Sequence, residues 1–519
     1  MKKKSGIILM LLLFITIICT ACSGSGLKEI KSFDDLNSSD VNISQPSDYD
    51  LSDPISEKCP LANMEYIDNA QLAFNSVSNG KIDAYFVGMN YYDAAVAEGM
   101  ADDLTILDEM VTTFYLGLGL SDQTPIDNYT QRVNDALSKL KNEGTLDEIK
   151  ARWFDTEDPE MPELPVAENP EYTLKIVTFG QCKPYSYFSD NKLIGFDVEL
   201  AYRVAYELNC DVEFETAEYS AMLAGLTTGR YDMVSANLYI TEERSESVTF
   251  SDPYESMDIC AVVRDSSASG KSEGFFESII SSFEKNFIRE SRWKMLLSGF
   301  GITLLITFFG FVGANIFGAV YCMLRLSNKK WCHAIASVYS AIMQGTPIVV
   351  ILMILFYVIF GNTNVSGVVI AILGFALDSG VGLGQIFYGG ITGVDAGQKE
   401  AALALGFTKT QGFFGITFPQ AARRNLEAYS SAFISLMKGT SIVGYVAVVD
   451  LTRAGNIIQS ITYEAFFPLI AVAIVYFVIS TILLRLASSL QKKLLKRKGA
   501  GKLENTGDKP LKGAKGEEK

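Results

Sequence analysis

A single histidine, His333, occurs in 519 residues, and the eight cysteines are scattered. The sequence contains no G-x4-G-K-[ST] run, the loop with which nucleotide hydrolases cradle phosphates. It also holds no convincing His/Cys cluster for a metal ion, and His333, close to Trp331, is interpreted as structural. These absences argue against an enzyme and against ATP hydrolysis by this chain, and we expect no cofactor.

The charge is distributed unequally along the chain. Residues 27–290 hold 19 Lys and Arg against 50 Asp and Glu, a net charge of −31. Residues 291–519 hold 22 against 10, a net charge of +12, and are strongly apolar. The chain is too long for one domain, so this pattern predicts a water-soluble domain joined to a membrane domain. The acidic balance argues against a nucleic-acid partner.

The first 22 residues have the pattern of a secretory signal. Lys2–Lys4 precede an apolar run from residue 7 to 18, and small residues lead to Cys22. The segment resembles a lipoprotein signal, which implies cleavage before Cys22 and its acylation, although Cys19 stands where that pattern has an aliphatic residue. An uncleaved anchor helix is the alternative. Both place the following residues outside the cell, and no small-domain disulfide framework is visible there.

Two α/β blocks follow, at residues 27–154 and 172–264, joined by a Pro- and Glu-rich linker at 155–171. Residues 79–87 predict a turn into a buried strand. Residues 128–149 have helical apolar spacing that is interrupted at Gly144.

Several short runs in these blocks carry a family resemblance. The second block holds GFDVEL from Gly195, LTTGRYD from Leu226, ITEER from Ile240 and FSDPY from Phe250. These resemble the first lobe of the polar amino-acid binding proteins of ABC importers. The first block holds FDDL from Phe33, GKIDA from Gly80 and GTLD from Gly144, which resemble the second lobe and tail. The resemblance implies a two-lobe periplasmic-binding-protein-like α/β domain of type II.

The order of the lobes is reversed relative to that family. Residues 263–266 would continue naturally into residues 30–33, so we interpret the two blocks as one circularly permuted domain. The alternative is a pair of half-domains that close with halves of another subunit. The absence of duplication between the blocks favours closure within one chain.

The resemblance implies a ligand site between the lobes. Arg244 would hold a carboxylate bidentately. Thr241 and Asn237 would contribute neighbouring hydroxyl or backbone contacts, and the ring of Tyr219 would stack on the ligand. A surface ion pair for Arg244 and simple packing for Tyr219 are the structural alternatives.

Two positions depart from the family pattern. Gly88 stands where the family has an Asp for the ligand's ammonium group, and Phe179 stands near a position that is often acidic. Asp48, at an expected helix start in the other lobe, is a substitute, as is a water molecule. Otherwise the ligand is not a standard α-amino acid.

The second half predicts an all-α membrane domain at 291–490, after a linker at 265–290. Five apolar segments are long enough to cross a bilayer, with a disordered basic tail at 491–519. Their approximate ranges are 295–324, 334–360, 365–388, 429–449 and 466–486. With the first segment starting outside, the basic loops and the C-terminus are cytoplasmic, in agreement with the positive-inside rule.

Residues 398–420 form a polar, Gly-containing loop between apolar segments. Here Glu400-Ala401-Ala402 is followed at fixed spacing by Gly406, Ile416 and Pro419. The pattern resembles the cytoplasmic coupling loop of ABC importer permeases, which implies that a short helix at Glu400 docks on a separate ATPase and that Gly406 provides the turn after it. An ordinary amphipathic loop helix is the alternative.

Together these features predict a multi-pass cell-membrane subunit of an ATP-driven importer, of a Gram-positive bacterial type. Its binding domain would capture a small polar solute, an amino acid, outside the cell. Its partners would be an ABC ATPase in trans, a second permease copy and the lipid bilayer. A ligand-gated channel, a sensor built from the same parts and an enzyme on the binding-domain fold are the rival interpretations.

Overall fold

The computed structural model describes residues 29–496, apart from residues 47–50, 68, 98, 157–158, 266–279, 362, 463 and 465. The described part divides into two compact units. The first contains residues up to Ile306 together with Pro347–Gly374 and Thr440–Ile474, and the second contains Thr307–Thr346, Phe375–Gly439 and the chain from Val475 onward. The expected signal at 1–22 with Cys22, and Asp48, lie outside the described residues.

One lobe of the first unit is built on a six-stranded sheet in the order β2-β1-β3-β13-β4, with β5 paired to β13. We call it the six-stranded lobe. Its strands are β1 (Asn42–Gln45), β2 (Asn63–Tyr66), β3 (Ala84–Gly88), β4 (Leu104–Ile106), β5 (Thr112–Leu116) and β13 (Glu255–Arg264). Its helices are α2 (Phe33–Leu36), α3 (Ser52–Lys58), α4 (Ala70–Ser78) and α5 (Met89–Ala97).

Both faces of this sheet are covered. In β3, Ala84 and Phe86 belong to one buried cluster, whereas Tyr85 and Val87 belong to another. Successive side chains of a strand point to opposite faces, so the continuous apolar run predicted at 79–87 fits a strand that is buried on both sides. The predicted strand is confirmed as β3, and all five of its residues are buried.

The other lobe, which we call the five-stranded lobe, has the strand order β10-β7-β11-β6-β12. Its strands are β6 (Gly119–Leu120), β7 (Tyr172–Thr178), β10 (Cys210–Thr216), β11 (Met233–Val234) and β12 (Thr249–Phe250), and a separate hairpin joins β8 (Tyr187–Ser189) to β9 (Lys192–Ile194). Its helices are α6 (Tyr129–Asn142), α7 (Thr145–Phe154), α8 (Phe196–Glu207), α9 (Tyr219–Thr227) and α10 (Glu242–Ser245).

The predicted interruption at Gly144 is confirmed. Gly144 has φ of 77°, a left-handed conformation that glycine adopts without steric cost, and it separates α6 from α7. The C-terminal end of α7 is held to α8, because the indole Nε1 of buried Trp153 donates to Glu199 over 2.8 Å. The last helix of the first block therefore packs on the lobe formed mainly by the second block.

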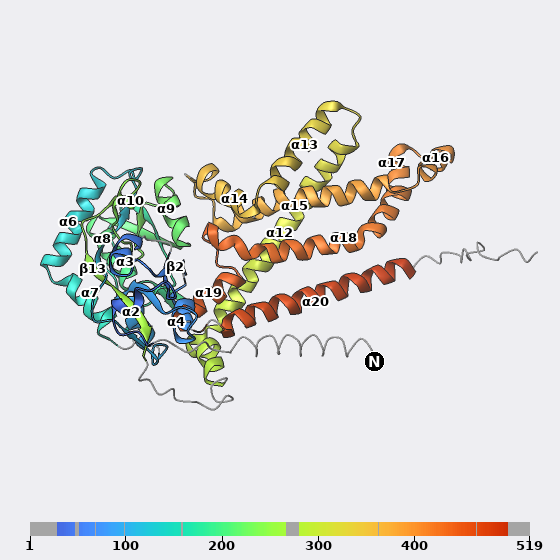
Figure 1. The fold of residues 1–519 in the computed structure, drawn as a ribbon. Helices are drawn as coiled ribbons and strands as arrows, with labels where there is room; N and C mark the ends of the chain where they lie inside the picture. The colour runs from blue at the N-terminus through green and yellow to red at the C-terminus, as the bar shows by residue number, and fades with distance from the viewer. Residues whose placement is uncertain are drawn as a thin grey trace, which may run out of the picture. The chain divides into compact units, whose positions relative to one another are not determined.

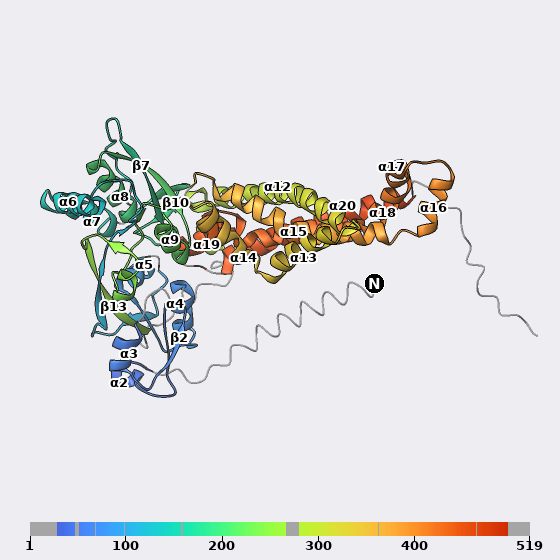
Figure 2. The same cartoon turned by 90° about the horizontal axis from the view of Figure 1, so that it is seen from above.

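Each sheet draws strands from both sequence blocks. Strand β13, from the second block, pairs with β3, β4 and β5 of the first. Strand β6, from the first block, pairs with β11 and β12 of the second. Figure 2 shows the two lobes in different parts of the same unit, with β13 running between them. The two blocks are thus joined by backbone hydrogen bonds within one chain.

Among the described residues, three helices are long and apolar enough to cross a membrane: α12 (Trp293–Leu326), α15 (Gly367–Thr392) and part of α20 (Phe466–Lys496). Two bent pairs pass the same test of length and composition when each is taken as one span. One joins α13 (Lys330–Gly345) to α14 (Ile348–Met353) and η3 (Ile354–Ile359) with a bend of 104°. The described part of the chain therefore holds three to five candidate spans, in agreement with a helical membrane domain.

The second bent pair contains the connecting loop. Its first arm runs through α17 (Lys409–Gly412), η4 (Phe413–Thr417), α18 (Phe418–Gly439) and η5 (Thr440–Val446). A bend of 54° separates this arm from α19 (Leu451–Thr462). A shorter helix, α16 (Ala396–Ala404), precedes α17.

Three structural details bear on the predicted segment ranges. The apolar segment 334–360 is not one straight helix, because the chain breaks at Pro347, which lacks the N–H that a continuous helix needs. The linker at 265–290 ends in helical structure, with α-helical residues 280–283 and the π-helix η1 (Glu284–Ile288), before a short η2 (Arg289–Ser291). Helix α20 continues past residue 490 to Lys496, since Gln, Lys and Leu favour helix.

Candidate ligand site and coupling loop

Arg244 lies on the short helix α10, and Thr241 caps its start. The Thr241 side chain accepts a hydrogen bond from the Arg244 backbone nitrogen over 3.2 Å. The Arg244 side chain is folded inward, and the residue is only 8% exposed. Its Nη1 donates to the Tyr239 carbonyl over 3.1 Å and lies 3.4 Å from the Tyr219 hydroxyl. The structure thus brings three of the predicted residues together.

The ring of Tyr219 also faces this guanidinium. The Arg244 Cζ lies 5.1 Å from the ring centroid, within the range of a cation–π contact. Tyr219 is the first residue of α9, so the helix start fixes its position. A buried guanidinium next to an aromatic face is suited to hold a carboxylate while the ring covers the rest of a small ligand.

Asn237 has a left-handed backbone, with φ of 52°. Its backbone nitrogen donates to the Asp197 carboxylate over 2.7 Å, and this anchor stabilises the unusual conformation. The side chain is buried, and within the described part of the chain its Oδ1 has no hydrogen-bond partner. A buried acceptor of this kind costs free energy unless a donor reaches it, which makes Oδ1 a candidate contact for a ligand donor.

Asp197 itself is fully buried beneath Asn237. Burial raises the pKa of its carboxyl to about 7, although the hydrogen bonds from the Tyr254 hydroxyl and the Asn237 backbone act in the opposite direction. The role of Asp197 in this arrangement is to position Asn237 from α8.

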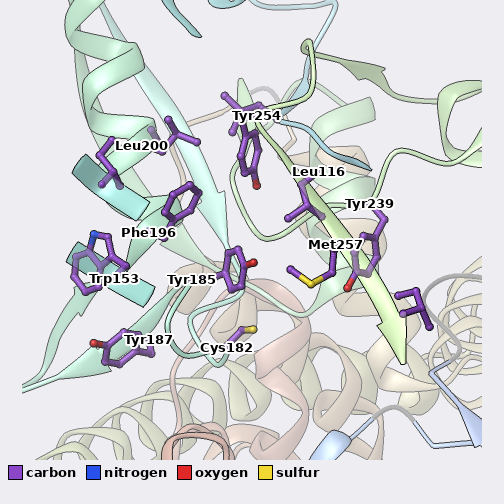
Figure 3. Close-up of a cluster of buried hydrophobic side chains, with 14 of the residues drawn as sticks. Leu116, Trp153, Cys182, Tyr185, Tyr187, Phe196, Leu200, Tyr239, Tyr254 and Met257 are labelled. Atoms are coloured by element: carbon purple, nitrogen blue, oxygen red, sulfur yellow. The ribbon is translucent and has the colours of Figure 1, made fainter. Parts of the chain in front are cut away.

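Tyr239 is the residue that the sequence reasoning missed. Its backbone oxygen binds Arg244, and its ring reaches toward Gly88 at the end of β3 in the other lobe. A Cβ at Gly88 would lie 2.5 Å from the Tyr239 hydroxyl and 2.5 Å from the Asn90 Oδ1. Figure 3 shows Tyr239 beside Met257, whose Cγ would lie 3.2 Å from that Cβ. The space in which an acidic side chain would begin at position 88 is therefore filled.

A signal for Tyr239 was present in the sequence. Tyr239 and Thr241 are two residues apart in a segment without helix, so their side chains share one side of an extended chain. Because Thr241 is a candidate site residue, Tyr239 belongs with it.

Phe179, another predicted ligand-site residue, lies apart from the contacts around Arg244. Phe179 follows β7 directly and packs, partly buried, against the main apolar cluster.

A cavity of about 370 Å³ is found in the second unit, and another of about 730 Å³ lies in the first unit beside α5 and the start of β13. The larger one is lined by Asn90, Tyr185 and Met257 among others, so it adjoins the surroundings of Gly88.

In the second unit, α16 carries three of the predicted coupling residues, Glu400, Ala401 and Ala402. The Asp395 side chain caps the helix by accepting a hydrogen bond from the Gly397 nitrogen over 2.7 Å. Glu400 and Ala401 are exposed on the helix. Gly406 has φ of 83° and nothing within 4 Å of an added Cβ, so its backbone, rather than lack of space, calls for glycine.

Ala402 faces the other way. It is 1% exposed, and its Cβ lies 3.4 Å from the position of a Cβ at Gly412 on α17. Small residues at both positions let the two short helices pack closely. Pro419 lies in the first turn of α18 and is partly exposed.

Large apolar side chains remain exposed around this loop. Between 51% and 76% of the surface of each of three apolar residues is accessible: Leu403, Leu405 and Phe414. An exposed apolar surface next to a charged helix is typical of a protein contact.

Comparisons with known proteins decide the family. Residues 174–438 match the model of the bacterial extracellular solute-binding proteins, family 3. The chain belongs to this family. The matched range takes in the second α/β block and also helices from α12 to α18.

Curated relatives of this family 3 protein are permeases. The "probable amino-acid ABC transporter permease protein YckA" of Bacillus subtilis is 30% identical over 199 residues, which is 38% of this chain and 88% of that protein. The "L-cystine transport system permease protein TcyB" of the same organism is 28% identical over 211 residues, 40% of this chain and 90% of that protein. The chain thus combines a solute-binding domain with an ABC-type permease, as its sequence predicted.

Among solved structures, an amino acid ABC transporter crystallised with histidines is 28% identical, with a TM-score of 0.37. The alignment covers 43% of this chain and 100% of that one. The curated permease relatives and the candidate membrane spans identify the chain as a membrane protein and a transport component of the ABC importer type.

Proposed function

We propose that this protein captures a small polar solute, an amino acid, between its two lobes and passes it through its own permease part at the expense of ATP hydrolysed by a separate chain. The ligand closes the lobes by binding the closed form better than the open one. The binding domain lies outside the cell, whereas the coupling loop and the C-terminus lie in the cytoplasm.

The observation that carries this proposal is the Arg244 site. A guanidinium that is 8% exposed and faces the Tyr219 ring at 5.1 Å is a receptor for a carboxylate. Neighbouring Asn237 presents a buried acceptor from the same lobe. A solute with a carboxylate and a hydrogen-bond donor, such as an amino acid, complements both groups.

Support for the transport step comes from the relatives and from α16. The permeases named above are amino-acid or cystine transport proteins. The exposed Glu400, with the turn at Gly406 and the apolar surface around Leu405, fits docking on an ATPase. Two permease copies, either two of this chain or this chain with a relative, would form the pathway.

The decisive test is uptake by the full chain in proteoliposomes with its ATPase. We expect uptake of one or a few amino acids that requires ATP and disappears without the ATPase. A ligand-evoked ionic current in the absence of any ATPase would instead support a ligand-gated channel.

Ligand capture has its own test in Arg244→Lys. Lysine keeps the charge but loses the planar fork, so we expect the ligand-induced rise in the melting temperature of the full chain to be lost. Arg132→Lys is the matched control, since Arg132 in the same lobe donates to the Leu208 carbonyl. An unchanged shift in Arg244→Lys would place the ligand elsewhere.

Coupling is tested by Glu400→Arg. Uptake and ligand-stimulated ATP hydrolysis should fall, while ligand binding stays normal. Glu427→Arg is a control, because Glu427 is an exposed residue of α18 outside the loop. Normal uptake by Glu400→Arg would refute the coupling role.

We also propose that the lobes close within one chain, as one circularly permuted domain at 27–264 with the linker at 155–171. The pairing of β13 with β3 and of β6 with β11 inside this chain supports the proposal. A fragment of residues 27–265 should melt cooperatively as a monomer. A fragment that folds only as a dimer would favour exchanged halves.

A further inference from the structure

Helix α19 follows the coupling loop and α18 in sequence, yet it belongs to the same compact unit as the lobes. Ten of its residues are buried: Leu451, Arg453, Ala454, Gly455, Ile457, Ile458, Gln459, Ser460, Ile461 and Thr462. Several of its apolar side chains join the same cluster as residues of both lobes. In Figures 1 and 2 the helix lies against this part of the molecule.

The N-terminal end of α19 binds the helix that carries Tyr219. The guanidinium of Arg453, 2% exposed, forms an ion pair with Glu218, whose side chain is 31% exposed. Glu218 is the N-cap of α9 and directly precedes Tyr219. The same short stretch of chain therefore contacts Arg244 through Tyr219 and α19 through Glu218.

The C-terminal part of α19 contacts both lobes through one residue. The Ser460 hydroxyl donates to the Gln181 Oε1, in the loop after β7, over 3.3 Å. The Gln71 Nε2, on α4 of the six-stranded lobe, donates to the Ser460 carbonyl over 3.4 Å. All three residues are buried. Ser460 thus sits where the two lobes approach one another along α19.

The polar contacts that the two lobes make with α19 and with the segment between α14 and α15 differ in chemistry. The five-stranded lobe has further contacts with residues between α14 and α15: Lys175 donates to Asn364 over 2.7 Å, and Arg230 lies 3.6 Å from the centroid of the Phe356 ring. These contacts and the Arg453 pair involve charged groups. The contact of Gln71 is a long hydrogen bond between neutral groups, which is weaker.

We propose that α19 is the element that senses lobe closure: the five-stranded lobe stays fixed to it through Glu218 and Arg453, and the six-stranded lobe engages Ser460 through Gln71 as the cleft closes. This inference rests on the proposed function, because it assigns the signal for transport to a particular helix. Gln71, Gln181 and Glu218 together form the surface to which α19 of the same chain binds.

The first test compares two cysteine pairs in the full reconstituted chain. The pair Glu218→Cys with Arg453→Cys should cross-link rapidly whether or not a mixture of the common L-amino acids is present. The pair Gln71→Cys with Ser460→Cys should cross-link at least several-fold more slowly without the mixture and speed up with it. Each single cysteine variant serves as the control.

Equal rates for both pairs in the absence of amino acids would overturn the inference, and this comparison needs no ligand. The mixture could raise the melting temperature and leave the cross-linking rate of the Gln71→Cys and Ser460→Cys pair unchanged. In that case the proposed sensing by Gln71 is wrong, whereas the proposed solute binding is supported. If the mixture has no effect on melting, the proposed amino-acid ligand is wrong, and the comparison without ligand still decides the inference.

The second test reverses the charges of the Arg453–Glu218 ion pair, first one at a time and then both together. Arg453→Glu and Glu218→Arg should each lower the maximal uptake rate about tenfold or more, with little change in the solute concentration that gives half of that rate. The double variant should recover most of the rate, because the pair is restored with opposite polarity. Failure of the double variant to recover, with normal folding by melting, would contradict a role for the pair in transmission.

Discussion

The backbone nitrogen of Asn237 donates a hydrogen bond to the fully buried carboxylate of Asp197 over 2.7 Å. Tyr254 donates to the other carboxylate oxygen over 3.0 Å. Asp197 therefore connects α8 and Tyr254, the residue directly before β13, to the left-handed residue in the ligand site. The cost of keeping this carboxylate away from water makes the arrangement sensitive to pH.

The first prediction concerns that dependence. Burial raises the pKa of Asp197 to about 7, whereas an unfolded chain releases this proton near pH 4. The folded state thus binds the proton more tightly, and its contribution to stability is fully present below about pH 4 and is lost as the pH rises through about 7. Asp197→Asn should flatten the fall in melting temperature of the full chain between pH 5 and pH 8. A slope equal to that of the native chain would contradict the assignment.

The second prediction concerns Glu199, which is fully buried on α8. It accepts hydrogen bonds from Trp153, from Arg152 over 2.6 Å and from Arg203 over 2.7 Å. Glu199→Gln removes the charge that both guanidinium groups share, so we expect a loss of about 3 kcal/mol in the free energy of unfolding. Denaturation of the binding domain checks this. Glu213→Gln, at an exposed position of β10, should change stability little.

The third prediction concerns Gly88 and Tyr239. Gly88→Ala places a methyl group 2.5 Å from the Tyr239 hydroxyl, and we expect a destabilisation of about 1–3 kcal/mol. Adding Tyr239→Phe removes that oxygen and should restore part of the loss, with Asn90 accounting for the remainder. Melting of the single and double variants measures the coupling. Gly301→Ala, with open space around its Cβ, is the control. Additive effects would show that the two positions do not meet.

The fourth prediction concerns the turn after α16. Gly406→Ala forces a side chain onto a backbone with φ of 83°, which costs about 1–2 kcal/mol. We expect lower ATP-driven uptake with unchanged solute binding, because the turn sets the direction of the coupling helix. Gly415→Ala is a matched control, since an added Cβ also meets open space there but φ is not positive. Equal uptake by Gly406→Ala and Gly415→Ala would show that the turn at Gly406 is not needed for coupling.

Local patterns determined much of the chain by themselves. The apolar run ending at Val87 became a strand buried on both faces, and Gly144 became a helix break, because both follow from side-chain alternation and backbone freedom over a few residues. Pro347 interrupts the apolar segment 334–360, but the bend of 104° depends on packing, which the sequence of the segment does not show. The ITEER motif pointed to Arg244, and the structure places this residue in contact with Tyr219.

Tertiary structure alone decided which distant residues meet. Tyr239 reaches Gly88, and Ser460 contacts both Gln181 and Gln71, across separations that carry no periodic signal. The pairing of strands from the two sequence blocks within each sheet is likewise decided by tertiary contacts. Motifs and turns are encoded by neighbouring residues, whereas the filled space at Gly88 and the burial of α19 arise only when separately folded segments pack and exclude water.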